Sequence, residues 1–331
     1  MAAQQDATLS PSSEHIPVLL DEVLNTLAAK SGDVIVDGTF GAGGYSRAIL
    51  DSTDVKLFGI DRDPAAIERA KAFKDFYGDR FSILQGRFGD MQALLASAGL
   101  DHVDGIVLDI GVSSFQINEA ERGFSFQGDG PLDMRMSLEG ETAADVVNTY
   151  GEEEIANIIY EYGEERKSRW IANAIVKERL ENPFTKTSEL AAVVVKTLGF
   201  KRKKNGKSIH PATKTFQALR IHVNDELGEL KRALKASVAL LKPGGRLVVV
   251  SFHSLEDRIV KNFMIEQSGQ KSSGSRHLPQ SMEAGPAPTF EIKKKGAVKP
   301  SDDEISRNPR SRSSRLRVAV RTKVAVWEGD L

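Results

Sequence analysis

The stretch VIVDGTFGAGG, residues 34–44, decides the fold of this chain. It predicts a short buried strand, a glycine turn and the start of a helix, the arrangement that lets a backbone approach a nucleotide-like ligand closely. The next apolar stretch, residues 55–60, ends at Asp61, where a carboxylate can accept hydrogen bonds from ribose hydroxyls. The two strands together predict a nucleoside-binding turn.

Asp37, directly ahead of the glycines, narrows the ligand. Dinucleotide folds place a pyrophosphate over this turn and use G-x-G-x-x-G, whereas the order here is Gly-Ala-Gly-Gly over 41–44. An acid suits a cationic amino-acid moiety better than a diphosphate, and S-adenosylmethionine carries such a moiety. Gly43 and Gly44 are predicted to let the backbone approach this cofactor, and Asp61 to bind its ribose. The alternative is an ordinary strand–turn–helix whose glycines only permit close packing.

Composition excludes several kinds of chemistry. The chain has 331 residues, a net charge of −1 and no cysteine. Without a thiol there can be no disulfide, cysteine-based zinc site, iron–sulfur cluster or cysteine nucleophile. Radical S-adenosylmethionine chemistry and cytosine-ring carbon methylation through a cysteine are therefore excluded. A methyltransferase of this composition would act on an amine nitrogen or a hydroxyl, and no metal is expected.

Nothing in the sequence predicts a membrane protein. No apolar run approaches the length of a transmembrane helix, and residues 1–13 lack the basic and apolar regions of a signal peptide. We therefore expect a cytoplasmic protein with no membrane partner.

Alternating apolar strands and helical patterns predict an α/β fold with a parallel sheet. The expected strands are 34–36, 57–60, 81–84, 105–108 and 246–251, followed by an antiparallel pair at 290–292 and 316–320. Between residues 118 and 212 the strand pattern stops and helical periodicity replaces it. We expect a flexible N-terminus over 1–14, a first domain part over 15–117, a helical insertion over 118–212 and a second domain part over 213–331. One long amphipathic helix, with apolar positions from 216 to 241, is predicted to lead back into the sheet.

Polar residues follow two more strands at their carboxyl ends, where ligands bind in open parallel sheets. Asp109 leads into Ile110-Gly-Val-Ser-Ser-Phe-Gln116, a candidate acceptor site, although an aspartate that caps a turn fits equally. His253, in SFHSLEDR from residue 251, could act as a base, as could Glu256 and Asp257. Asp257 and Arg258 could instead form a surface ion pair.

Basic and aromatic residues suggest contact with nucleic acid. The basic clusters are 201–204 with Lys207, 293–295, and the arginines at 307, 310, 312, 315 and 317. One such cluster is usually a solvated face, but three on a near-neutral chain look more like phosphate contacts. Phe115, Phe124 and Phe126 could stack on bases or belong to the core of the helical insertion.

The chain resembles the MraW/RsmH family of bacterial 16S ribosomal RNA cytosine-N4 methyltransferases from His15 to its C-terminal strand. The matching motifs are HIPVLLDE from His15, DGTFGAGG from Asp37, DRDP from Asp61, DIGVSS from Asp109, ERGFSFQGDGPLDMRM from Glu121, YGEER from Tyr162, HPATKTFQALRI from His210, SFHSLEDRIVK from Ser251 and NPRSRSSRLRV from Asn308. So many long motifs in one order are highly specific.

The resemblance implies a Rossmann-like class I S-adenosylmethionine-dependent methyltransferase sheet with an inserted helical subdomain that recognises RNA. It implies methylation of the exocyclic N4 amine of a decoding-centre cytidine in 16S rRNA of the 30S subunit. The implied cofactor contacts are Gly43, Gly44, Tyr45, Asp61, Phe88, Asp109 and Gln116, beside Asp37 from the motif itself. Tyr45 departs from the family, because many members have histidine there, and its contact would be made by backbone or ring.

For catalysis we expect Asp109, Ser113 and Ser114 to align the target amine, with His253 as a candidate base. The Asp/Asn-Pro-Pro-aromatic signature of many amino-methyltransferases is absent after the fourth strand. Two other classes remain open: a dinucleotide oxidoreductase, which would bind NAD(H), and a non-catalytic ribosome-assembly factor, which would bind small subunits without consuming S-adenosylmethionine. The sequence also leaves open whether the chain forms a homodimer.

Overall fold

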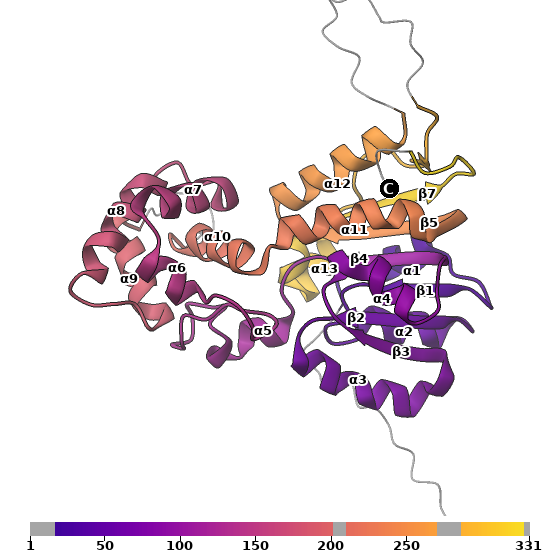
Figure 1. The fold of residues 1–331 in the computed structure, drawn as a ribbon, viewed down its shortest axis with the longest axis horizontal. Coiled ribbons are helices and arrows are strands. Elements are labelled where there is room, and N and C mark those ends of the chain that lie inside the picture. The colour runs from indigo at the N-terminus through magenta and orange to yellow at the C-terminus, as the bar shows by residue number, and fades with distance from the viewer. Residues whose placement is uncertain (1–16, 201–209, 270–285, 328–331) are drawn as a thin grey trace, which may run out of the picture. The chain divides into compact units, whose positions relative to one another are not determined.

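The computed structural model describes residues 17–200, 210–269 and 286–327, and the chain forms two compact units (Figure 1). Of the described residues, one unit combines 17–111 with 228–269 and 286–327, and the other comprises 112–200 and 210–227. The second unit extends further on both sides than the helical insertion expected at 118–212. The predicted N-terminal segment 1–14 lies outside the described residues.

A seven-stranded sheet forms the first unit, in the order β3-β2-β1-β4-β5-β7-β6 among the described residues (Figure 1). The strands are β1 (Val34–Asp37), β2 (Lys56–Asp61), β3 (Phe81–Gln85), β4 (Val103–Asp109), β5 (Leu241–Ser251), β6 (Phe290–Glu291) and β7 (Arg315–Arg321). Strands β1 to β5 pair in parallel, and β7 pairs antiparallel with both β5 and β6. The predicted Rossmann-like sheet and its terminal antiparallel pair are therefore confirmed.

Helices cover both faces of this sheet. They are α1 (Leu20–Leu27), α2 (Gly44–Ser52), α3 (Pro64–Tyr77), α4 (Met91–Ser97), α11 (Glu226–Leu240), α12 (Ser254–Gln267) and α13 (Asp302–Arg307). Successive strand residues point to opposite faces, so Ile106 and Val249 belong to one hydrophobic cluster, while Val107 and Val248 belong to the other. Each central strand is consequently apolar on both sides, which explains the unbroken apolar runs in the sequence.

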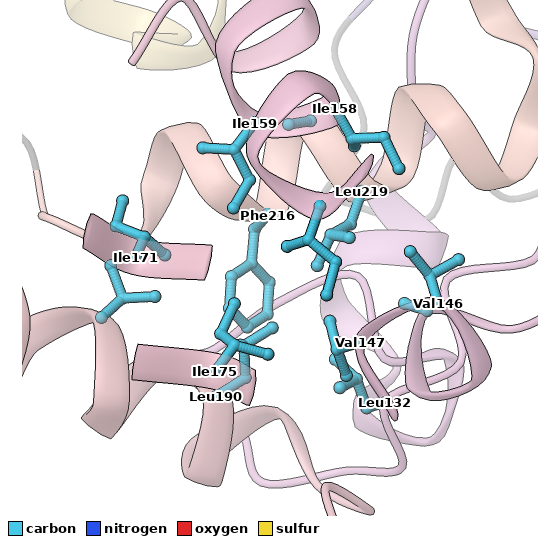
Figure 2. Close-up of a cluster of buried hydrophobic side chains, with 14 of the residues drawn as sticks. Leu132, Val146, Val147, Ile158, Ile159, Ile171, Ile175, Leu190, Phe216 and Leu219 are labelled. Carbon is cyan, nitrogen blue, oxygen red and sulfur yellow. The ribbon is translucent and has the colours of Figure 1, made fainter. Parts of the chain in front are cut away.

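The second unit is helical. Its helices are α5 (Ser114–Asn118), α6 (Ala143–Thr149), α7 (Glu152–Gly163), α8 (Ser168–Arg179), α9 (Thr187–Leu198) and α10 (Thr213–Asn224). The apolar faces of α6 to α10 meet in one core, where Phe216 and Leu219 of α10 lie among Ile159, Ile175 and Leu190 (Figure 2). Helices α6, α7, α8 and α9 lie within residues 118–212, where helical periodicity was predicted. Trp170 of α8 is 62% exposed.

The long helix predicted over 216–241 is wrong, because two helices, α10 and α11, replace it. Asp225 between them adopts a left-handed backbone conformation with φ of 50°. The buried Asn224 side chain accepts a hydrogen bond from Met136 N (2.9 Å) and donates to Met134 O (2.7 Å). These bonds to a distant loop fix the end of α10, and α10 belongs to the helical unit rather than to the second sheet segment.

Candidate active site

Asp37 ends β1 as a buried carboxylate held within its own turn. Its Oδ2 accepts a hydrogen bond from Ser46 Oγ (2.7 Å), and its Oδ1 accepts one from Thr39 N (3.2 Å). Burial raises the pKa of Asp37 to about 6, and the nearby Asp61 carboxylate adds to this increase. A carboxylate that is costly to ionise in isolation is well suited to a cationic partner, which would favour its charged form.

Close packing explains why glycine occupies two positions of the turn. A Cβ on Gly43 would lie 2.3 Å from Phe73 Cζ, and a Cβ on Gly44 would lie 2.6 Å from Pro17 Cγ. Gly43 also has a φ of 74°, a conformation that other residues rarely adopt. We predicted these glycines from close approach of a cofactor, but neighbouring apolar side chains already require them.

Tyr45, in the first turn of α2, points into the core. Its ring is buried in the cluster that holds Val18 and Phe40, and its hydroxyl donates a hydrogen bond to Val18 O. Burial raises the pKa of this hydroxyl well above its ordinary value. Burial of the ring favours a ligand contact made by the backbone of Tyr45, and both predicted contacts stay predictions.

Asp61 ends β2 and holds the glycine turn. Its Oδ2 accepts a hydrogen bond from Gly41 N (2.7 Å), and its Oδ1 accepts one from Asp63 N (2.8 Å). Burial raises the pKa of Asp61, although these two N–H donors counteract the increase. Each carboxylate oxygen can accept a further hydrogen bond, which leaves capacity for the hydroxyls of a ribose.

Phe88 begins a 3₁₀ turn, η2 (Phe88–Asp90), that follows β3. Its half-buried ring packs against the cluster that contains Met91 and Leu95. Because β3 is the neighbour of β2, the structure places this ring after the strand next to Asp61.

Asp109 ends β4 and differs from the other two acids in its hydrogen bonding. Its backbone N donates to Thr39 Oγ1 (2.6 Å), the residue whose own N–H binds Asp37. Its buried Oδ1 atom has no hydrogen-bond partner among the residues that the structure describes. Burial raises the pKa of Asp109 well above its ordinary value, and the carboxylates of Asp37 and Glu256 raise it further. A buried acceptor without a partner is a natural contact for a bound group.

His253 caps the helix that follows β5. Its Nδ1 accepts a long hydrogen bond from Glu256 N (3.5 Å), and its Nε2 lies 2.8 Å from Glu256 Oε1. The fully buried Glu256 also accepts from Phe252 N (2.7 Å) through Oε2. Asp257 pairs with Arg317 (Oδ1 to Nε, 2.7 Å). The interactions of Glu256 and Asp257 make each of them a structural residue rather than a free base.

The remaining predicted residues belong to the helical unit. Ser113 caps α5: its Oγ accepts from Gln116 N (3.2 Å), and Gln116 Oε1 accepts from Ser113 N (3.0 Å). Ser114 is the first residue of this helix and is half-buried. Ser113 and Gln116 thus have a capping role, and the structure does not assign a ligand to either.

The structure brings four predicted residues to one edge of the sheet. Asp37, Asp61, Asp109 and His253 stand at or just after the carboxyl ends of β1, β2, β4 and β5. Sequence reasoning missed Thr39 and Ser46, the hydroxyls that hold Asp109 N and Asp37. Thr39 lies within the motif of residues 34–44, and a hydroxyl residue in a glycine turn was the signal that could have identified it. Within the described ranges, no His, Asp and Glu cluster could hold a metal ion.

The basic clusters have different surroundings. Lys201–204 and Lys207 lie outside the described residues. Lys294 and Lys295, with Lys261 of α12, line a cavity of about 280 Å³, and Met264 and Ile292 also belong to its lining. Of the arginines, Arg317 is bound to Asp257 and Arg315 donates to Ser314 O (2.7 Å). The described helices include none that is long and apolar enough to cross a membrane.

The candidate stacking aromatics belong largely to the core. Phe124 is buried in the helical unit, and Phe126 stacks on His210 with ring centroids 4.4 Å apart. Phe115 is half-buried on α5. Among the described residues, the exposed aromatic side chains of this unit are instead Tyr160, Trp170 and Phe200, at 58%, 62% and 65% exposure.

Comparison with known proteins covers almost the whole chain. The sequence profile of the MraW methylase family matches residues 12–322. The ribosomal RNA small subunit methyltransferase H of Rhodospirillum rubrum is 55% identical over 316 residues, which cover 95% of this chain and 96% of the relative. The protein of the same name from Caulobacter vibrioides is 53% identical over 96% of this chain and 98% of its own. A solved rRNA methylase from Streptococcus thermophilus matches 92% of this chain and 93% of its own with a TM-score of 0.39 and 8% identity, too distant to add to these relationships.

Proposed function

The chain belongs to the MraW methylase family of S-adenosylmethionine-dependent methyltransferases, and we propose that it methylates 16S rRNA of the small ribosomal subunit. The proposed acceptor is the exocyclic N4 amine of a decoding-centre cytidine. The observation that carries this proposal is the unpartnered, buried Oδ1 of Asp109, on the strand next to the turn that holds Asp37. A hydrogen-bond acceptor at this position can orient an amine. Methylation of an amine needs no cysteine nucleophile and is therefore compatible with the composition of the chain.

The cofactor residues fit S-adenosylmethionine by charge and by polarity. The bound cofactor would supply a methyl group on a sulfonium. Asp37 and Asp61 would face its cationic and ribose parts, and Phe88 would offer an apolar surface to its adenine. Burial raises the pKa values of Asp37 and Asp61, and a cation beside a carboxyl group opposes such an increase. Binding and ionisation would therefore support each other.

At the acceptor, the protein's part is alignment. The lone pair of a cytosine amine is delocalised into the ring, and a hydrogen-bond acceptor that holds an N–H favours the geometry in which nitrogen can attack. The Asp109 carboxyl group would accept such a bond through Oδ1. Orientation of the two reactants can supply several kcal/mol of the reduction in barrier. The Ser113 and Ser114 hydroxyls stay candidates for the second N–H, and His253 stays a candidate for the proton lost after transfer.

RNA recognition is assigned to the helical unit and to the lysines around the cavity. Trp170, 4.9 Å from Lys167 Nζ at its ring centroid, offers an exposed face on which a base can stack. The target cytidine must leave its stack to reach the acidic site, which costs a few kcal/mol. Exposed aromatics and lysines would offset part of this cost by contacts with bases and phosphates.

The decisive experiment is transfer of labelled methyl groups from S-adenosylmethionine to small ribosomal subunits from cells that lack this protein, followed by nucleoside analysis. We expect label in N4-methylcytidine at a single position. Label in another nucleoside would overturn the acceptor assignment. No label on subunits that the protein nevertheless binds would favour the non-catalytic assembly factor.

A further inference from the structure

One buried glutamate is bound to the segments on both sides of the proposed adenosine site. Glu229 lies on α11 with a fully buried side chain. Its Oε1 accepts hydrogen bonds from Arg62 Nη1 (2.6 Å) and from Arg87 Nη1 (3.0 Å). Arg62 directly follows Asp61, and Arg87 directly precedes Phe88. A single carboxylate oxygen thus connects the neighbours of two proposed cofactor contacts.

The turn that contains Phe88 also packs closely against the backbone of Glu229. A Cβ on Gly89, in the turn that begins with Phe88, would lie 3.0 Å from Glu229 Cα and 3.2 Å from Glu229 O. The turn therefore lies directly on α11 at this residue. In addition, Gly86 N donates to Asp61 O (2.9 Å), which joins the ends of β2 and β3. The position of Phe88 relative to Asp61 is determined by these contacts together.

We propose that Glu229 is a positioning residue for the cofactor: it holds Asp61 and Phe88 at the separation that a ribose and its adenine require. The inference rests on the proposed function, because it takes these two residues as cofactor contacts. A buried carboxylate between two guanidinium groups cannot be lost without leaving both arginines under-compensated. The side chains of Arg62 and Arg87 would then lose their shared partner, and the turn of Phe88 could shift relative to Asp61. Misplacement of binding groups by about 1 Å can lower activity up to about 100-fold.

The test uses Glu229→Gln in the full chain. The amide keeps the size and one acceptor oxygen but removes the negative charge that faces Arg62 and Arg87. We therefore expect the KM for S-adenosylmethionine and the Kd for S-adenosylhomocysteine to rise about tenfold. The KM for the RNA substrate should not change, and kcat at saturating cofactor should fall less than the affinity. Arg87→Met, at a side chain that is 40% exposed, is the milder second variant, with about a threefold increase expected.

A carboxylate at the opposite edge of the same sheet provides the control. Asp104 Oδ2 accepts hydrogen bonds from Val34 N (2.9 Å) and Lys242 Nζ (2.8 Å), at the amino-terminal ends of β1 and β5. Asp104→Asn should lower the melting temperature and leave the affinity for S-adenosylhomocysteine unchanged. If Glu229 had only a structural role, Glu229→Gln would behave like Asp104→Asn. A folded Glu229→Gln variant with unchanged affinity for S-adenosylhomocysteine would therefore overturn the proposal.

Failure of the inference can be told from failure of the proposed site. Asp61→Asn should weaken S-adenosylhomocysteine binding if Asp61 contacts the ribose. Normal binding by Asp61→Asn would discard the site assignment and the role of Glu229 together. Weakened binding by Asp61→Asn with normal binding by both Glu229→Gln and Arg87→Met would discard only the role of Glu229.

Discussion

The carboxyl ends of β1 and β2 differ from those of β4 and β5 in how their polar atoms are satisfied. At β1 and β2, both oxygens of Asp37 and of Asp61 accept a hydrogen bond from residues close to the ends of these strands. At β4, Asp109 Oδ1 is buried without a partner among the described residues, and after β5 the His253 and Glu256 side chains face each other. In the first half each carboxylate oxygen already accepts one hydrogen bond within the protein, whereas the second half contains a buried acceptor that a substrate can satisfy. We assign cofactor binding to the first half and acceptor chemistry to the second.

Asp109→Ala is the strongest way to break this comparison. If Oδ1 aligns the target amine, its removal should lower kcat about 100-fold, the effect of losing one preoriented polar group at a reacting centre. Cofactor affinity should change much less. Asp109→Asn, which keeps one acceptor oxygen, should retain intermediate activity. Both are measured by methyl transfer to small subunits and by calorimetric titration with S-adenosylhomocysteine. Full methylation by the alanine variant would remove Asp109 from any essential role.

Asp37→Asn should separate binding from stability. Because burial raises its pKa from 3.8 to about 6, the folded protein binds a proton more readily than the unfolded chain. Ionised Asp37 therefore lowers the free energy of unfolding at pH 7 by up to about 3 kcal/mol. The asparagine can keep the bonds to Thr39 N and Ser46 Oγ. We expect a higher melting temperature with cofactor affinity at least tenfold lower, measured by calorimetry.

The reverse pattern would be informative. A lower melting temperature with normal cofactor affinity would mean that Asp37 serves only to hold the turn. Ser46→Ala is a matched control, since it removes the partner of Oδ2 without removing the negative charge. It should weaken cofactor binding less than Asp37→Asn does.

The acids at the strand ends could be predicted from local sequence, whereas the residues that hold them in place could not. Buried apolar runs that end in an acid gave the strand ends at Asp37, Asp61 and Asp109. Glu229, by contrast, occupies one position of an amphipathic helix in which a charged residue usually faces water. Its two arginine partners are far away in sequence, at positions 62 and 87. No local pattern identifies a residue that is buried by contacts of this kind.

Long-range hydrogen bonds also explain the principal error in the fold. Apolar spacing runs on from 216 to 241 with no helix-breaking proline or glycine at the break, so one helix was the reasonable prediction. The end of α10 at Asn224 depends on backbone groups of Met134 and Met136. Similarly, the buried hydroxyl of Tyr45 binds Val18 O, 27 residues away in sequence. Both outcomes are tertiary contacts that override local preference.

The pH dependence of cofactor binding would sharpen the assignment of Asp37. In the free protein the carboxyl becomes protonated as the pH falls through about 6, and a neutral acid attracts a cationic ligand less. Affinity for S-adenosylmethionine should be constant at higher pH and decrease by up to about tenfold per unit below this value. Calorimetry between pH 5 and 8 measures the effect. Asp37→Asn should flatten the curve, and a curve of wild-type shape in that variant would assign the titration to another group.

His253→Asn should have the smallest effect and decides what the β5 end contributes. Asparagine is a good N-cap, so it can replace the Nδ1 contact with Glu256 N, whereas His253→Ala should cost about 1 kcal/mol of unfolding free energy. Since the imidazole caps α12 and lies against Glu256, we expect kcat of the asparagine variant within about threefold of wild type. A decrease of about 100-fold in that variant, with normal stability, would instead identify His253 as the proton acceptor. In that event Asp109 would align the amine and His253 would take its proton, and the acceptor half would have two separate chemical roles.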